Sequence, residues 1–205
     1  MQLLTISPSR TEVKVDRQRV PLFTDDVPRC YQRNIAGHAL RTSKLARTLA
    51  HSMQCTEEVA HLMALAALMH DIGKIDIPAN ILDKSGPLTE QEWSVIRRHP
   101  QIGHQMLIEA GGIYAYIAPL VLAHHERWDG KGYPYGLAGE AIPLGARVLA
   151  VVDAFDAMTE HRPYRPTITI DEAKVELRRC AGSAFDPAVV EALLTLYRKE
   201  RADVL

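Results

Sequence analysis

The pattern of hydrophobic and polar positions predicts helices along most of the chain. Residues 35–53 carry apolar side chains at helical spacing, and residues 57–71 are apolar nearly all round, which is typical of a central buried helix. Thr89 and Glu92 form a capping-box pattern that opens a predicted helix through about Glu109. Four more helices are expected near residues 114–126, 143–158, 171–181 and 187–201. The pattern therefore predicts an all-α bundle.

Three segments depart from this helical pattern. Residues 1–28 alternate in a strand-like way between prolines, which predicts an N-terminal arm or a short hairpin ahead of a helical domain over residues 29–205. Residues 76–87 (DIPANILDKSGP) and the glycine-rich residues 128–142 (WDGKGYPYGLAGEAI) are predicted to be irregular loops. Long loops in a compact domain are usually functional, so we expect these two to border a site.

The candidate chemistry lies in histidines and aspartates within apolar surroundings. His70 and Asp71 are the clearest case, because they follow directly after the Ala/Leu-rich run of residues 57–69. Taken singly, such residues have ordinary structural explanations: a lone buried histidine finds a hydrogen-bond partner, and an aspartate ends a helix or pairs with an arginine. Seven of them in one chain favour a shared role, and they are His38, His70, Asp71, His99, His124, His125 and Asp153.

These seven residues fit a metal centre. They lie on different predicted helices or at helix ends, and a helical bundle can bring such side chains together in its centre. Imidazole and carboxylate ligands without thiolate suit iron, manganese or zinc. An aspartate between two cations can bridge them, and such a pair orients a phosphodiester and acidifies a bridging water. On a helix the rings of His124 and His125 diverge by about 100°, so both reach one site only around a wide pocket or at a helix end.

The composition argues against several classes of partner and indicates a cellular compartment. A net charge of −1 gives no reason to expect DNA, RNA or an anionic membrane as a partner. No apolar stretch approaches the roughly 18 residues of a membrane span, and the N-terminus has no apolar signal segment. The three cysteines form no CxxC pair, which argues against a disulfide framework or a thiolate zinc site. We therefore expect a cytoplasmic protein.

Four motifs together resemble the HD-GYP subgroup of the HD-domain metal-dependent phosphohydrolases. They are HDIGK (residues 70–74), HP (99–100), HHERWDGKGYP (124–134) and DAFDAMTEHRPYR (153–165). A bare HD dipeptide is weak evidence, but this ordered set of motifs is strong evidence, and the resemblance is specific and covers roughly residues 30–200. The resemblance implies an HD-domain helical bundle whose metal centre hydrolyses cyclic di-GMP, a bacterial second messenger.

The resemblance also implies a role for each matched position. The seven histidines and aspartates would bind metal, with Asp71 as the bridge. Asp71 and Lys74 would act in catalysis, since Lys74 matches a lysine that contacts the substrate phosphate. Arg162 and Arg165 match positions that reach phosphate, a task suited to the arginine fork.

The GYP signature is matched by Gly132, Tyr133 and Pro134. In the family this signature shapes a loop beside the substrate pocket and is proposed to dock protein partners such as diguanylate cyclase domains. Plain packing of Tyr133 against the bundle stays open as an alternative. Glu126, just after the histidine pair, is a candidate for orienting a ligand imidazole, and Trp93 is interpreted as a packing residue.

One position departs from the family pattern. Members with a third metal carry a glutamate four residues before the first ligand histidine, where this chain has Asn34. A neutral amide does little to balance a third divalent cation. We therefore expect two divalent metal ions, iron or manganese first, with zinc, nickel or magnesium as alternatives, and linear pGpG as the main product. A module that binds cyclic di-GMP or docks proteins without turnover stays open, as does an HD phosphohydrolase acting on another nucleotide.

Overall fold

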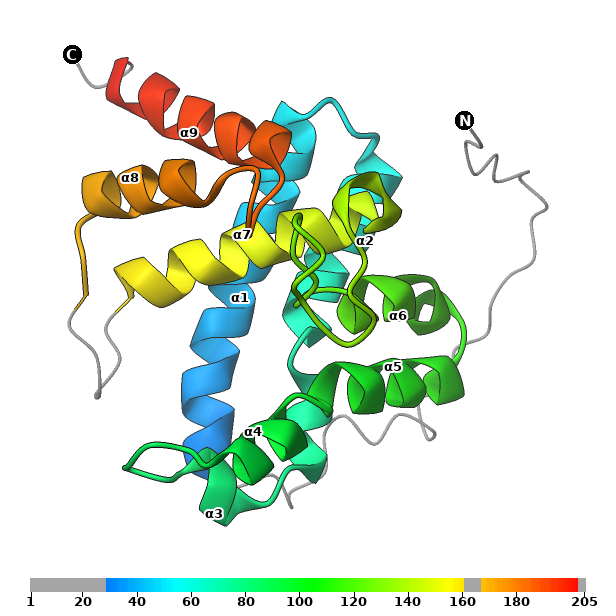
Figure 1. Ribbon diagram of the computed structural model, residues 1–205. Helices are drawn as coiled ribbons and strands as arrows, with labels where there is room; N and C mark the ends of the chain where they lie inside the picture. The colour runs from blue at the N-terminus through cyan, green and yellow to red at the C-terminus, as the bar shows by residue number, and fades with distance from the viewer. Residues whose placement is uncertain (1–28, 161–166, 203–205) are drawn as a thin grey trace.

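Helices build the part of the chain that the structure, a computed structural model, describes: residues 29–160 and 167–202 (Figure 1). In chain order they are α1 (Arg29–Ser52), α2 (Glu57–Met69), η2 (Ile72–Asp76), α3 (Ala79–Leu82), α4 (Glu90–Ile96), α5 (His99–Ala110), α6 (Ile113–Leu122), η3 (Gly139–Ala141), α7 (Leu144–Thr159), α8 (Ile170–Cys180) and α9 (Pro187–Ala202). Within these residues, β-pairing is limited to isolated bridges. The predicted all-α class is confirmed, whereas the predicted arm of residues 1–28 lies outside the described residues.

The segment after Thr89 forms two helices where one is predicted. The capping box is present, since the Thr89 hydroxyl accepts from Glu92 N at 3.2 Å and the Glu92 carboxylate accepts from Thr89 N at 2.7 Å. However, α4 ends at Ile96 and α5 begins at His99, so the single predicted helix is wrong. Pro100 explains the break, because proline disrupts a helix interior but suits a first turn. The break places His99 at a helix start.

The HD pair lies just beyond a helix. The structure ends α2 before His70, and Asp71 precedes η2, so the helix predicted over residues 57–71 is slightly too long. Residues 76–87, predicted to be irregular, contain the single turn α3. That part of the loop prediction is wrong, because Pro78 at the N-cap has a backbone angle already suited to starting a turn.

The pair His124 and His125 also follows a helix end. The last residue of α6 is Leu122, so the helix predicted over residues 114–126 is too long at its C-terminus. Of the two arrangements that allow both rings to reach one site, the structure has the helix end. The turn after α6 frees the two rings from helical spacing.

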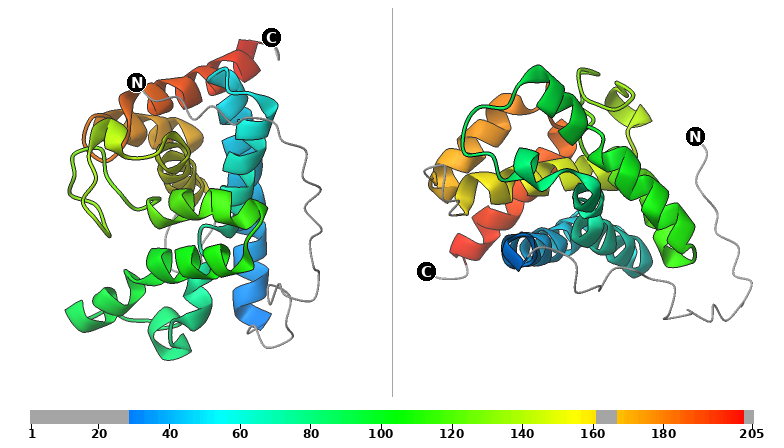
Figure 2. Two further views of the ribbon diagram at one scale, coloured as in Figure 1. Left: turned by 90° about the vertical axis from the view of Figure 1, so that its right-hand side faces the viewer. Right: turned by 90° about the horizontal axis from the view of Figure 1, so that it is seen from below.

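The helices pack around one apolar core. Figures 1 and 2 show α1 beside α2 and crossed by α7, while α5 and α6 lie next to each other. Leu49, Leu107, Ile117, Leu149 and Leu193 are among the fully buried side chains of this core. None of the described helices has the length and apolar character that crossing a membrane requires. The candidate residues lie where α1, α2, α5, α6 and α7 approach one another.

Candidate metal centre

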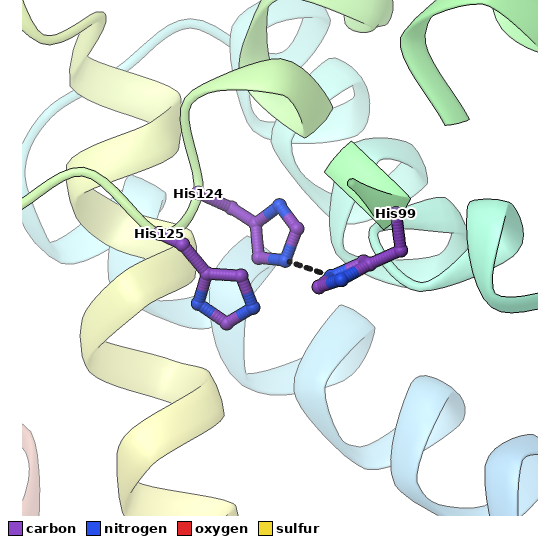
Figure 3. A group of neighbouring side chains, drawn as sticks. All are labelled: His99, His124 and His125. Atoms are coloured by element: carbon purple, nitrogen blue, oxygen red, sulfur yellow. Dashed lines mark hydrogen bonds between the residues drawn. The ribbon is translucent and has the colours of Figure 1, made fainter. Parts of the chain in front are cut away.

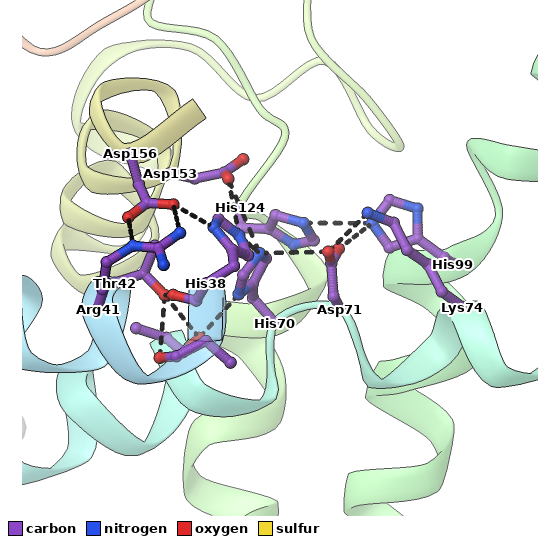
Figure 4. A network of polar contacts seen from close by, with 12 residues as sticks. His38, Arg41, Thr42, His70, Asp71, Lys74, His99, His124, Asp153 and Asp156 are labelled. Carbon is purple, nitrogen blue, oxygen red and sulfur yellow. Dashed lines mark hydrogen bonds and ion pairs between the residues drawn. The ribbon is translucent and has the colours of Figure 1, made fainter. Parts of the chain in front are cut away.

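The structure brings six of the seven candidate residues into two groups, in each of which the possible ligand atoms lie within 4.8 Å of one another. The imidazole triad consists of His99, His124 and His125 (Figure 3). The mixed triad consists of His38, His70 and Asp153 (Figure 4). Each triad thus supplies three donor atoms to one point, the number that three protein ligands give a metal ion in many catalytic sites.

Asp71, the seventh residue, lies between the two triads. Its Oδ1 is 3.4 Å from His99 Nε2, and its Oδ2 is 3.5 Å from His70 Nε2. Figure 4 shows the carboxylate with His70 on one side and His99 on the other. One oxygen therefore faces each triad, which is the arrangement expected of a bridging carboxylate.

Backbone carbonyls set the orientation of three of these rings. The Nδ1 atoms of His70, His99 and His124 each donate to the carbonyl oxygen three residues earlier, at 2.7, 2.8 and 2.6 Å. Because Nδ1 carries the proton, Nε2 of each neutral ring carries a lone pair that points inward. The same backbone contact positions ligand histidines in metalloproteins.

In the imidazole triad these lone pairs face one another. Burial lowers the pKa of His99, lowers that of His124 well below its usual value, and lowers that of His125 to about 4. The rings are therefore neutral at pH 7, yet His99 Nε2 and His124 Nε2 are only 3.3 Å apart. Two acceptors this close repel unless a cation lies between them, so the donor set fits a metal ion.

The mixed triad is charged. His38 Nε2 lies 3.2 Å from Asp153 Oδ1, and His38 Nδ1 lies 2.7 Å from Asp156 Oδ2. Burial lowers the pKa of His38, but its hydrogen bonds with the two carboxylates outweigh burial and raise the pKa to about 9. Burial opposes ionisation of Asp153, yet the hydrogen bond with the protonated His38 holds its pKa below the usual range. A metal ion would replace the His38 proton here.

Two residues of this network were missed by the sequence analysis. Asp156 is 5% exposed and accepts from Arg41 Nε at 2.6 Å and Arg41 Nη2 at 3.0 Å. Carboxylates that hold the outer nitrogen of a ligand histidine fix the ring and raise its basicity. The available signal was spacing: Arg41 lies three residues after His38, and Asp156 three after Asp153, so each pair shares a helix face.

Lys74 lies against the Asp71 carboxylate. Its Nζ is 2.6 Å from Asp71 Oδ2. Burial raises the pKa of Asp71, but the positive charge of Lys74 opposes this effect, and that pKa lies well below its usual value. Gly73 allows η2 to lie close to α5, because a Cβ there would overlap the His99 carbonyl of α5. Lys74 therefore helps to keep Asp71 ionised in a buried site.

The GYP residues hold the loop against the imidazole triad. A Cβ at Gly132 would lie 2.6 Å from the His125 carbonyl oxygen, so only glycine fits without a shift. Tyr133 packs on His125 with ring centroids 4.9 Å apart, and Pro134 follows through a cis peptide bond.

The buried Glu126 carboxylate accepts from the backbone N–H groups of residues 135 and 137, at 2.7 and 3.1 Å. The hydrogen bonds of Glu126 therefore hold the backbone of the loop, whereas the sequence analysis made Glu126 a candidate for orienting a ligand imidazole.

Three predicted positions have side chains outside the described residues. Arg162 and Arg165 belong to the segment 161–166, and the side chain of Asn34 precedes the first described side chain of α1. The described donors are five imidazoles and two carboxylates without thiolate, a set that suits iron, manganese or zinc. With a carboxylate between two donor groups, the arrangement can hold two cations over one phosphodiester.

Comparisons with known proteins agree with this geometry. A family model described as an HD domain matches residues 19–189. The cyclic di-GMP phosphodiesterase response regulator RpfG of Xanthomonas campestris is 46% identical over 155 residues, covering 75% of this chain and 41% of that protein. The 3'3'-cGAMP-specific phosphodiesterase 2 of Vibrio cholerae is 36% identical over 163 residues, covering 79% of this chain and 31% of that protein. The chain thus spans less than half the length of these relatives.

A solved structure shows the same fold. The chain matches Bd1817, an HDG"Y"P protein from Bdellovibrio bacteriovorus, with a TM-score of 0.63 at 21% identity, covering 80% of this chain and 52% of that one. At this identity the likeness concerns the fold alone. Family model, relatives and fold agree with the resemblance found in the motifs.

Proposed function

The chain belongs to the HD-domain family, and on this premise we propose that it is a metal-dependent phosphodiesterase that hydrolyses cyclic di-GMP to linear pGpG. The observation that carries the proposal is the Asp71 carboxylate, which has one oxygen toward each of two triads of metal-compatible donors. The names of the relatives support a cyclic dinucleotide as the substrate class.

In this proposal the two triads and Asp71 hold two divalent cations, iron or manganese first. Such a pair, when bound, lowers the pKa of a bridging water and stabilises charge on the phosphodiester. Lys74 stays beside Asp71, where its ammonium group offsets the negative charge of an incoming phosphate. Arg162 and Arg165 contribute further phosphate contacts. Asn34 in place of a glutamate supports two cations rather than three, and hence pGpG as the main product.

The loop that carries Gly132, Tyr133 and Pro134 has a second proposed role. It borders the substrate, and its outer surface docks protein partners such as diguanylate cyclase domains. Tyr135, which follows Pro134 in this loop and is 64% exposed, supports the proposal that the loop offers a docking surface. The proposal places the HD-GYP domain in residues 29–205, with residues 1–28 as an arm, and places the protein in the cytoplasm.

The test is anaerobic purification with metal analysis, followed by incubation with cyclic di-GMP under Fe(II) or Mn(II) and chromatography of the products. We expect about two metal ions per chain and release of pGpG. Asp71→Ala should remove both metal and turnover, whereas Asp76→Ala, an exposed carboxylate nearby on η2, serves as the matched control.

Metal binding without hydrolysis of cyclic di-GMP would contradict the proposed reaction. Hydrolysis of 3'3'-cGAMP in its place would move the substrate to that of the second relative. A protein without bound metal would show that the donor groups have another purpose.

A further inference from the structure

Arg97 lies at the edge of the candidate metal centre between two aromatic rings. Its guanidinium carbon is 5.9 Å from the centroid of the Trp93 ring and 5.9 Å from the centroid of the Tyr133 ring. Tyr133 in turn packs on His125 of the imidazole triad. A continuous series of ring and guanidinium contacts therefore leads outward from the triad.

Exposure increases along this series. His125 and Tyr133 are partly buried, Arg97 is exposed, and Trp93 is 41% exposed, so part of the indole is accessible to a ligand. Arg41 and Arg147 are each bound to an aspartate. Among the described side chains, those of residues 37–160 and 167–198, the partners of the Arg97 guanidinium are by contrast the two rings. Its N–H groups are thus available to a ligand.

The position suits a nucleobase. In a cyclic dinucleotide each base is joined through a ribose to the phosphodiester, so a base would extend outward from a phosphate held at the metal centre. Aromatic contacts hold a guanidinium in place and leave its N–H edge free. That edge matches guanine, which presents two acceptors, O6 and N7, whereas adenine presents a donor at N6. The exposed part of the Trp93 ring can contact the base as well.

We propose that Arg97, held by Trp93 and Tyr133, is a guanine-recognition residue of this site. The inference rests on the proposed function and adds the determinant of base specificity. Arg97 acts through the base, away from the reacting atoms. Its loss should therefore change KM and base preference more than metal content or kcat.

The test compares Arg97→Ala with Arg98→Ala on three substrates: cyclic di-GMP, cyclic di-AMP and bis(p-nitrophenyl) phosphate, which has no base. Arg97→Ala should lower kcat/KM for cyclic di-GMP on the order of 10- to 100-fold, mainly through KM, and at least tenfold more than for the other two substrates. Arg97→Lys should also lose the preference, because lysine has no fork. Arg98, an exposed neighbour outside the ring series, is the matched control.

Two results would overturn the inference. An equal loss of kcat/KM on all three substrates would place Arg97 at the phosphate or the metal ions. An unchanged preference for cyclic di-GMP in Arg97→Ala would show that Arg97 takes no part in base recognition. Failure of the proposed function looks different: the wild-type protein would cleave bis(p-nitrophenyl) phosphate but neither cyclic dinucleotide.

Discussion

The imidazole triad and the mixed triad face the same aspartate, Asp71, but are built differently. The imidazole triad holds neutral rings, because burial lowers the pKa of each. Two of its rings are set by backbone carbonyls of the preceding turn, and the third packs on the GYP loop. The mixed triad contains a carboxylate and a histidine whose pKa is raised to about 9. Its orientation depends on Asp156 and Arg41.

The two triads differ in how far apart along the chain the residues lie that orient their histidines. Contacts within one turn of the chain prepare the imidazole triad to receive a cation. The mixed triad depends on a contact between His38 and Asp156, which are 118 residues apart, and holds a proton that a cation must displace. The two triads should therefore respond differently to mutation and to pH.

The largest effect should follow removal of one ligand from each triad. We expect His99→Ala to lose the ion of the imidazole triad and His38→Ala the ion of the mixed triad, as measured by metal analysis. Each should lower turnover on the order of 1,000-fold, since removing an outer partner alone costs roughly 10- to 100-fold. His104→Ala, on α5 but outside both triads, is the control. Loss of both ions from either variant would contradict this prediction, because it would show that the two triads act as one site.

The second effect is specific to the mixed triad. Asp156→Asn weakens the carboxylate contact to His38, so metal affinity there should fall on the order of 10- to 100-fold, while the imidazole triad keeps its affinity. Calorimetric metal titration separates the two sites. Glu160→Gln removes a more exposed partner of Arg41, 3.6 Å away, and should leave both affinities unchanged. Equal weakening of both triads by Asp156→Asn would contradict this division.

The third effect is a difference in pH dependence. His38 has a raised pKa and is protonated below about pH 9 in the metal-free protein, so affinity of the mixed triad should rise with pH, by up to roughly tenfold per unit. The imidazole triad, whose His125 has a pKa of about 4, is already deprotonated at neutral pH and should change little. His99→Ala and His38→Ala provide each triad alone for titration against a chelator. Parallel pH profiles would refute the difference.

The smallest effect should come from the loop. In Gly132→Ala the new methyl group would lie 2.5 Å from Glu126 Cα and force the loop to shift. The free energy of unfolding should fall by about 1–3 kcal/mol, measured by denaturant titration. Affinity should fall modestly at the imidazole triad alone, because Tyr133 moves from His125. Gly86→Ala meets no neighbour within 4 Å and is the control. A loop variant that weakens the mixed triad equally would contradict the separation.

The seven residues that the structure brings together could be singled out from the sequence because they stand out as histidines and aspartates in apolar surroundings and most of them lie in an ordered set of motifs. The all-α class could be predicted because apolar positions recur at helical intervals. Spacing placed Arg41 on the helix face of His38 and Asp156 on that of Asp153, but it could not show that these partners, 115 residues apart, bind each other. The break before His99 was hidden by a strong capping box, although Pro100 was the available signal. The recognition role inferred for Arg97 needed the fold to bring Tyr133 beside α4.

The most direct test of the two-cation centre is an anomalous-diffraction map of crystals of the Mn(II)-loaded protein. We expect one anomalous peak in each triad, with an oxygen of Asp71 toward each. A single peak, or peaks away from the triads with Asp71 bound to Lys74 alone, would contradict the bridged two-metal centre.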